Sequence, residues 1–307
     1  MKALVTGGAG FIGSNIVKLL VEEGHETTVL DNLSSGYLTN LSAFKNVRFI
    51  EGDIRAPETV EEAVRGTDTV FHLAASVGNK RSIDFPLEDA SINVIGTLQV
   101  LEAARRHGVR KVVFSSSAGI FGELKTLPIP EDHAVEPDTP YGASKLGAEK
   151  ACLAYAKLYP IECVCLRYFN VYGVNQRYDA YGNVIPIFAH RILHKQPVTI
   201  FGNGEQTRDF VNVRDVARAN YNAAKSRKVS GAFNIGAGSR ISINALAHLM
   251  YQTVDQTPMI EHGPPRPGDV RDSLADVGAA RAMFDYQPTV SLDEGMREYL
   301  AWASTAF

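Results

Sequence analysis

The amino terminus carries a glycine-rich turn between an expected strand and an expected helix. Lys2–Thr6 (KALVT) is a short apolar run that suits a buried parallel strand, and GGAGFIG follows at residues 7–13. A helical pattern of Ile16, Leu19 and Leu20 comes next. Glycines allow a tight turn with close backbone approach, and a helix amino terminus offers unpaired N–H groups to a pyrophosphate. The order of strand, turn and helix predicts a dinucleotide-binding site.

An acidic residue stands at the end of the next expected strand. Residues 27–30 form this strand, and Asp31 follows it. At that distance from the glycines, an acid accepts from the adenine-ribose 2′-hydroxyl and repels a 2′-phosphate, which favours NAD over NADP. Asp53 and Ile54 follow a third strand, residues 47–50, where an adenine edge would lie. For Asp53, a cap on the loop is the other interpretation.

Tyr141 and Lys145 have the spacing YxxxK, and a serine run, Ser115 to Ser117, lies upstream. Positions i and i+4 of a helix share a face, so Lys145 can hold its ammonium near whatever Tyr141 contacts. A free tyrosine hydroxyl titrates near pH ~10, and a nearby cation favours the phenolate. The pattern therefore predicts a tyrosine whose pKa is lowered toward neutral pH and which acts as acid and base. Taken alone, the spacing is typical of an exposed helix face.

Composition fits a folded enzyme. The 307 residues are 45% hydrophobic, enough for one large core or a core with an added lobe. A net charge of −3 without a basic stripe predicts no nucleic-acid or membrane partner. Cys163 and Cys165 suit the core, and eight scattered histidines show no ligand spacing, so no metal is expected. Met1 leads directly into a strand, and no apolar run of ~18 residues is present, which predicts a cytoplasmic protein.

Strand and helix patterns alternate along the first part of the chain. Further strands are expected at residues 69–73, 111–115 and 163–168, with helices at 90–107 and around Tyr141. This alternation predicts an α/β fold, a doubly wound parallel sheet of the Rossmann type. After Asn170, glycines and prolines punctuate the sequence, which indicates a smaller α/β lobe. We expect a NAD-binding domain at 1–170, a smaller second lobe at 171–307, and a return of 209–235 to the first domain.

A series of ordered motifs resembles those of the extended short-chain dehydrogenase/reductase superfamily, and within it the UDP-sugar 4-epimerases. The resemblance covers essentially the whole chain and implies NAD as the cofactor and a UDP-sugar as the substrate. The motifs are GGAGFIG, DNLSSG at 31–36, GDI at 52–54, FHLAA at 71–75, SSSAGIFG at 115–122, YGASK at 141–145 and RYFNVYG at 167–173.

The resemblance also implies roles for single residues. In that family the serine matching Ser117 hydrogen-bonds the sugar 4-oxygen, the tyrosine matching Tyr141 is the base, and the lysine matching Lys145 holds the nicotinamide ribose. Members commonly dimerise through two helices per subunit, here about residues 90–107 and the Tyr141 helix, whose apolar residues suit a core equally well. With Tyr141 and Lys145, the implied cofactor contacts are Gly7, Gly10, Phe11, Ile12, Gly13, Asp31, Asn32, Asp53, Ile54, Leu73, Ala74, Ala75, Asn93, Ser115 and Tyr168.

Two small residues argue against removal of water. Sugar 4,6-dehydratases of this superfamily carry a Glu, often beside an Asp, directly after the catalytic hydroxyl position, and UDP-glucuronate decarboxylases carry a Glu there. Ala118 and Gly119 stand at these positions and cannot transfer a proton. What remains is oxidation and re-reduction at one carbon.

The second lobe supplies the nucleotide end by resemblance. Arg208 and Arg266 match two arginines that grip the diphosphate, and a guanidinium suits phosphate because it binds in two-point geometry. Phe201 lies near the expected uracil site. The implied substrate contacts are Ser117, Tyr141, Asn170, Asn183, Val184, Phe201, Arg208, Arg266, Asp269 and Ser273.

Ser273 bears on the choice of sugar. Some glucose/galactose-restricted members carry a tyrosine at this position, beside the sugar C2 substituent, whereas serine leaves room for an acetamide. The sequence thus predicts an NAD-dependent epimerase that inverts C4 of UDP-glucose/UDP-galactose and their N-acetyl forms through a 4-keto intermediate. Alternatives left open are a net sugar-nucleotide dehydrogenase or reductase, a 3,5-epimerase, a UDP-glucuronate 4-epimerase, and a catalytically silent NAD-binding regulator.

Overall fold

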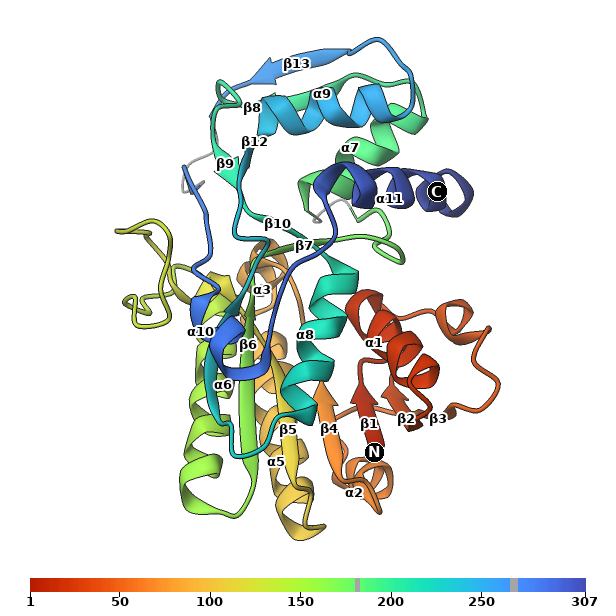
Figure 1. Cartoon of the computed structure of the whole chain (residues 1–307), viewed down its shortest axis with the longest axis vertical. Coiled ribbons are helices and arrows are strands. Elements are labelled where there is room, and N and C mark those ends of the chain that lie inside the picture. The colour runs from red at the N-terminus through yellow and green to blue at the C-terminus, as the bar shows by residue number, and fades with distance from the viewer. Residues whose placement is uncertain (180–182, 266–269) are drawn as a thin grey trace.

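A seven-stranded parallel sheet forms the centre of the molecule (Figure 1). The computed structural model describes residues 1–179, 183–265 and 270–307. The strand order is β11-β6-β5-β4-β1-β2-β3, so the chain starts in the middle, winds to one edge and then crosses to the other. The predicted doubly wound sheet is confirmed. Its strands are β1 (Lys2–Thr6), β2 (Glu26–Asp31), β3 (Arg48–Glu51), β4 (Thr69–His72), β5 (Lys111–Ser117), β6 (Glu162–Tyr168) and β11 (Gly231–Ile235).

Helices cover both faces of this sheet because its strands are apolar on both sides. On β1, Ala3 and Val5 join one buried cluster, and Leu4 joins the cluster on the opposite face. The first cluster lies beneath α1 (Phe11–Glu22), α8 (Val213–Lys225) and α10 (Gly278–Phe284). The second lies beneath α2 (Pro57–Val64), α5 (Thr97–Arg106) and α6 (Pro140–Leu158).

The helix expected at 90–107 is present, as the later part of a longer helical run that contains a π-helical segment. After α3 (Asn79–Asp84), the chain forms α4 (Pro86–Ala90), a π-helical turn at Ser91–Gly96, and then α5. A π-turn is wider than an α-turn and often occurs at functional sites. This one carries the buried Asn93.

A smaller lobe lies above the carboxyl ends of the strands in Figure 1. Its core is a third apolar cluster between helices and three short strand pairs, β7–β10, β8–β13 and β9–β12. β10 therefore pairs within this lobe, whereas β11 joins the central sheet. The elements are β7 (Asn170–Tyr172), α7 (Val184–Leu193), β8 (Val198–Phe201), β9 (Thr207–Arg208), β10 (Phe210–Asn212), β12 (Ile241–Ser242), α9 (Ile243–Thr253), β13 (Ile260–Gly263) and α11 (Leu292–Ala306).

The domain boundary at residue 170 stays a prediction. Across the described ranges, no helix combines the length and apolarity that crossing a bilayer requires.

Candidate functional site

The glycine turn between β1 and α1 is a concave loop that side chains would fill. Gly7 has φ +69°, and a Cβ there would lie 2.7 Å from the Ala74 nitrogen. A Cβ on Gly13 would lie 2.1 Å from the Gly7 carbonyl oxygen, so the turn and the helix pack with no room for a side chain. Gly10 is the amino-terminal cap of α1, whose first turn has no acidic residue. This cradle and the free helix end fit a dinucleotide pyrophosphate.

Asp31 lies beside this turn at the end of β2. Its carboxylate accepts hydrogen bonds from the backbone N–H of Ala9 at 2.9 Å and of Leu33 at 2.8 Å. Asp31 is buried, and burial raises its pKa. The side chain therefore anchors the glycine turn. Its contact with a ribose hydroxyl stays a prediction.

Asp53 is part of a charged turn. Both of its carboxylate oxygens bind the Arg55 guanidinium, at 2.9 and 2.7 Å, and Asn32 Nδ2 donates to it at 3.1 Å. The Arg55 contact is the main cause that lowers the pKa of Asp53 to about 2. Ile54 is buried against Gly96. The loop-cap interpretation of Asp53 thus describes a real contact, and its predicted role at adenine stays a prediction.

Ser117 and Tyr141 come together where β5 ends and α6 begins. Thr139 caps α6 by accepting from the N–H of Gly142 at 3.2 Å, and this cap fixes the first turn that carries Tyr141. Ser117 Oγ accepts from the N–H of Gly119 at 3.1 Å. Burial raises the pKa of Tyr141, and a hydrogen bond with Ser117 works in the opposite direction.

Lys145 lies one turn further along α6, with Nζ 4.4 Å from the centre of the Phe114 ring. Burial lowers the pKa of Lys145 to about 8, so the ammonium remains the main form at neutral pH. The expected lowering of the Tyr141 pKa is wrong for the protein chain itself, because loss of solvent around the hydroxyl outweighs the favourable contacts.

A buried polar network of Asp89, Asn93 and Ser144 supports this helix turn. The sequence analysis assigned a role to Asn93 but none to Asp89 or Ser144. Ser144 Oγ donates to Asp89 at 2.5 Å, and Asn93 Nδ2 lies 3.2 Å from Asp89 and 3.0 Å from Ser144. Asn93 also binds both backbone groups of Ser76. The i, i+4 spacing of Asp89 and Asn93 is the sequence pattern that could have indicated a shared face.

The other predicted cofactor residues lie near the carboxyl ends of β4, β5 and β6. The backbone N–H groups of Leu73 and Ala74 donate to Thr6 Oγ1 at 3.2 Å, which places the 73–75 loop over Gly7. Tyr168 is buried, and its hydroxyl bonds with Asn220 at 3.0 Å. Burial is the main cause that raises the pKa of Tyr168, and Ser115 hydrogen-bonds to the same hydroxyl.

The predicted substrate contacts occupy several elements of the smaller lobe. Asn170 Nδ2 donates to the Asp209 carbonyl at 3.1 Å, and Ser273 N donates to the Thr207 carbonyl at 3.1 Å. The Ser273 and Arg208 segments are therefore neighbours, with Ser273 buried. Asn183 caps α7, Val184 begins it, and Phe201 ends β8. Arg266 and Asp269 lie outside the described residues.

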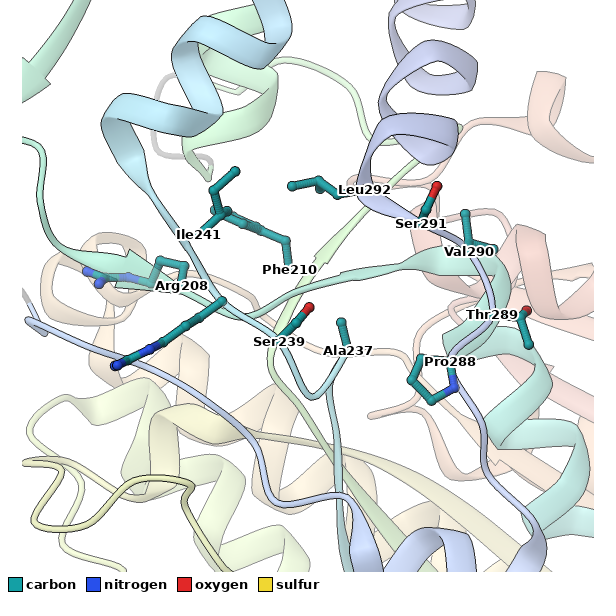
Figure 2. Close-up of a pocket in the computed structure, with 11 residues that line it drawn as sticks. Arg208, Phe210, Ala237, Ser239, Ile241, Pro288, Thr289, Val290, Ser291 and Leu292 are labelled. Atoms are coloured by element: carbon teal, nitrogen blue, oxygen red, sulfur yellow. The ribbon is translucent and has the colours of Figure 1, made fainter.

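A cavity of about 390 Å³ opens beside Arg208. Figure 2 shows Phe210, Ile241 and Leu292 around it. The described residues that line it include Arg208, but Ser117, Tyr141 and Lys145 are not among them. The cavity therefore does not contain the predicted reaction centre.

Comparisons with known proteins identify the family of the chain. The model of the NAD dependent epimerase/dehydratase family matches residues 3–236. The UDP-glucose 4-epimerase of Mycolicibacterium smegmatis is 40% identical over 301 residues, 96% of each chain. The structure of UDP-N-acetylglucosamine 4-epimerase from Methanobrevibacter ruminantium with UDP-N-acetylmuramic acid has a TM-score of 0.96 at 34% identity, over 100% of this chain and 99% of that one. UDP-glucose 4-epimerase from Thermotoga maritima with UDP-glucose has a TM-score of 0.94 at 38% identity, with the same coverage.

Proposed function

The chain belongs to the NAD-dependent epimerase/dehydratase family, and we propose that it inverts C4 of a UDP-hexose. The substrates are UDP-glucose/UDP-galactose and their N-acetyl forms. One observation carries the proposal: Ser117 Oγ and the Tyr141 ring both lie beside Gly119, just after β5, at 3.3 and 3.8 Å from the position that a Cβ on Gly119 would take. Ala118 and Gly119 stand where a dehydratase needs carboxylates. NAD is the cofactor of the family, and the glycine turn with Asp31 fits it.

The catalytic residues divide the work at C4. Ser117 Oγ holds the sugar 4-oxygen, and Tyr141 takes the 4-hydroxyl proton. Lys145 keeps a positive charge close to the tyrosinate that forms. Bound NAD supplies the hydride acceptor and, on return, the hydride donor. Once the 4-keto sugar has turned to present its other face to the hydride donor, Tyr141 gives the proton back to the 4-oxygen.

The smaller lobe holds the UDP end throughout this cycle. Arg208 and Arg266 bind the diphosphate, while Asn170, Asn183 and Phe201 bind the nucleotide. If UDP is bound tightly and the sugar weakly, the 4-keto sugar can rotate in the site without dissociating. Binding energy at the UDP end, far from C4, therefore contributes to the reaction. The relatives that bind UDP-glucose and UDP-N-acetylmuramic acid support a UDP-sugar in this place.

Incubation with UDP-galactose without added NAD tests the activity. An epimerase that retains its cofactor forms UDP-glucose with no net NADH absorbance, whereas a dehydrogenase requires added cofactor and a regulator forms no product. A panel that adds UDP-glucose, both UDP-N-acetylhexosamines and UDP-glucuronate, scored by product, defines the sugar. Tyr141→Phe is the negative control and should lose about 10²–10⁴-fold or more in kcat. A Phe variant with near-normal turnover would remove Tyr141 from the reaction.

We also propose a homodimer through the outer faces of α5 and α6. Ile95 in the π-turn and Leu158 at the end of α6 are large apolar side chains, 50% and 72% exposed. Each leaves apolar side-chain area uncovered on one of the two helical segments, which supports an interface between two copies there. Ile95→Glu with Leu158→Glu should shift the mass in light scattering from dimer to monomer. Leu38→Glu, an exposed apolar residue outside these helices, is the control that should leave the mass unchanged.

A further inference from the structure

Asp89 is a buried carboxylate next to the catalytic helix turn. It is 1% exposed, and Lys145 is 3% exposed. Asp89 accepts hydrogen bonds from two neutral groups, Ser144 Oγ and Asn93 Nδ2. Within the described part of the chain, no lysine or arginine lies within ion-pair distance of Asp89. A buried carboxylate held only by neutral donors is costly unless a positive charge lies nearby.

Lys145 is the nearby positive charge. Its ammonium is also buried, so it too needs an opposite charge close by. Its ammonium packs on the Phe114 ring rather than against a carboxylate. The charged and titratable groups that face it come from α4, α6, β4 and β6. These groups are Asp89, Glu149, Cys152, His72 and Cys165. Burial lowers the pKa of His72 to about 3, so His72 is neutral and cannot balance Asp89.

Glu149 is the other carboxylate in this set, and it already has a partner. Both of its oxygens bind Arg167, at 3.1 and 2.8 Å. That leaves Asp89 as the carboxylate near Lys145 without a cation of its own. The same residue is fixed in place, because Ser144 Oγ, which bonds to Asp89, also lies 3.0 Å from the Tyr141 carbonyl oxygen.

We propose that Asp89 is a positioning residue for the catalytic pair, whose buried charge balances Lys145 and whose bonds hold the first turn of α6. The inference rests on the proposed function of Tyr141 and Lys145. The negative charge of Asp89 favours the ammonium of Lys145 and opposes a second negative charge on Tyr141. Asp89 therefore raises the pKa of both groups. Asp89 thus preserves the lysine charge in a water-poor site at some cost to the tyrosinate.

Asp89→Asn tests this directly, because it removes the charge and keeps the shape. Without the charge, the pKa of Tyr141 and that of Lys145 should both fall. Both limbs of the pH profile of kcat/KM should therefore move to lower pH, by on the order of one pH unit at an effective dielectric of ~20. Glu88→Gln is the matched control: it removes a carboxylate from the adjacent, exposed position of α4 and should leave both limbs in place.

A second measurement needs no substrate. The near-ultraviolet absorbance of tyrosinate, taken as the difference between each protein and its Tyr141→Phe counterpart, reports the titration of Tyr141 itself. Its midpoint should be lower in Asp89→Asn than in the unmodified protein and unchanged in Glu88→Gln. If the protein proves not to be an epimerase, this titration still tests the charge of Asp89, so the two failures can be distinguished.

A purely structural role would lower turnover at every pH and leave the limbs and the tyrosinate midpoint where they are. That result, or a shift to higher pH, in a folded Asp89→Asn variant overturns the proposal. If Asp89→Asn does not fold, Asp89→Ala carries the same test, because a methyl group needs no hydrogen-bond partner.

Discussion

Glu149 and Arg167 form a two-point ion pair inside the protein, with Nε and Nη2 of the arginine 3.1 and 2.8 Å from the two carboxylate oxygens. The glutamate side chain is 0% exposed and the arginine side chain 5%. Ser116 Oγ donates to the same carboxylate at 2.7 Å, and Arg167 Nη1 donates to the Glu131 carbonyl at 2.7 Å. The pair therefore joins α6 to β5 and β6 directly behind Ser117.

Breaking this pair should destabilise the fold strongly. Glu149→Gln leaves the Arg167 charge buried without its partner, and such a loss typically costs about 3–5 kcal/mol. Urea unfolding should show the corresponding fall in the free energy of unfolding. Glu62→Gln removes a carboxylate from the exposed Arg48–Glu62 pair and is the matched control, with little change expected. Equal losses of unfolding free energy in the two variants would show that the buried pair contributes no more to stability than the exposed pair.

A second buried carboxylate makes stability depend on pH. Asp209 accepts backbone N–H bonds from Ala237, Gly238 and Ala275, and burial raises its pKa to about 6. Its ordinary value is ~3.9, so between these values the folded state binds the proton more tightly than the unfolded state. The stability that Asp209 contributes is thus complete below pH ~4 and is lost as pH rises through about 6.

Asp209→Asn isolates this effect. Relative to the variant, the unmodified protein should lose up to about 3 kcal/mol of unfolding free energy as pH rises from ~4 to ~6, and no more above that range. The amide offers fewer acceptors to the three N–H groups, so the variant is expected to be less stable at low pH. Urea unfolding of both proteins at several pH values measures the difference. A difference that does not vary with pH would contradict the raised pKa.

Much of the fold could be predicted because parallel strands follow from local patterns. Apolar runs such as Lys2–Thr6 match the observed strands, and a glycine turn after the first strand fixes where a dinucleotide can bind. The π-helical segment at Ser91–Gly96 could not be predicted, because the apolar spacing of the sequence does not distinguish a π-turn from an α-turn. The direction in which the Tyr141 pKa shifts was also predicted wrongly, because the shift depends on burial and the YxxxK spacing does not encode burial.

The cofactor preference should depend on the charge of Asp31. We expect the protein to purify with NAD(H) and to bind NADP much more weakly, because the carboxylate repels a 2′-phosphate. Asp31→Asn and Asp31→Ala should both relax this discrimination in binding titrations. Asp31→Ala should also lower Tm, since it loses the bonds to Ala9 and Leu33 that anchor the glycine turn. Equal affinity of the unmodified protein for NAD and NADP would overturn the assignment.

Sugar specificity should change at Ser273. This residue is buried, and its segment pairs with the one that carries Arg208. A phenol ring there should fill the space that a 2-acetamido group needs, whereas a 2-hydroxyl still fits. Ser273→Tyr should therefore lose the UDP-N-acetylhexosamines by about 10²-fold or more in kcat/KM and retain UDP-glucose and UDP-galactose. Ser273→Ala is the control that should keep both pairs. A general loss of stability would lower kcat/KM for both substrate pairs together, so the ratio of kcat/KM between the pairs within one variant is decisive. An unchanged ratio in Ser273→Tyr would show that Ser273 does not line the C2 pocket.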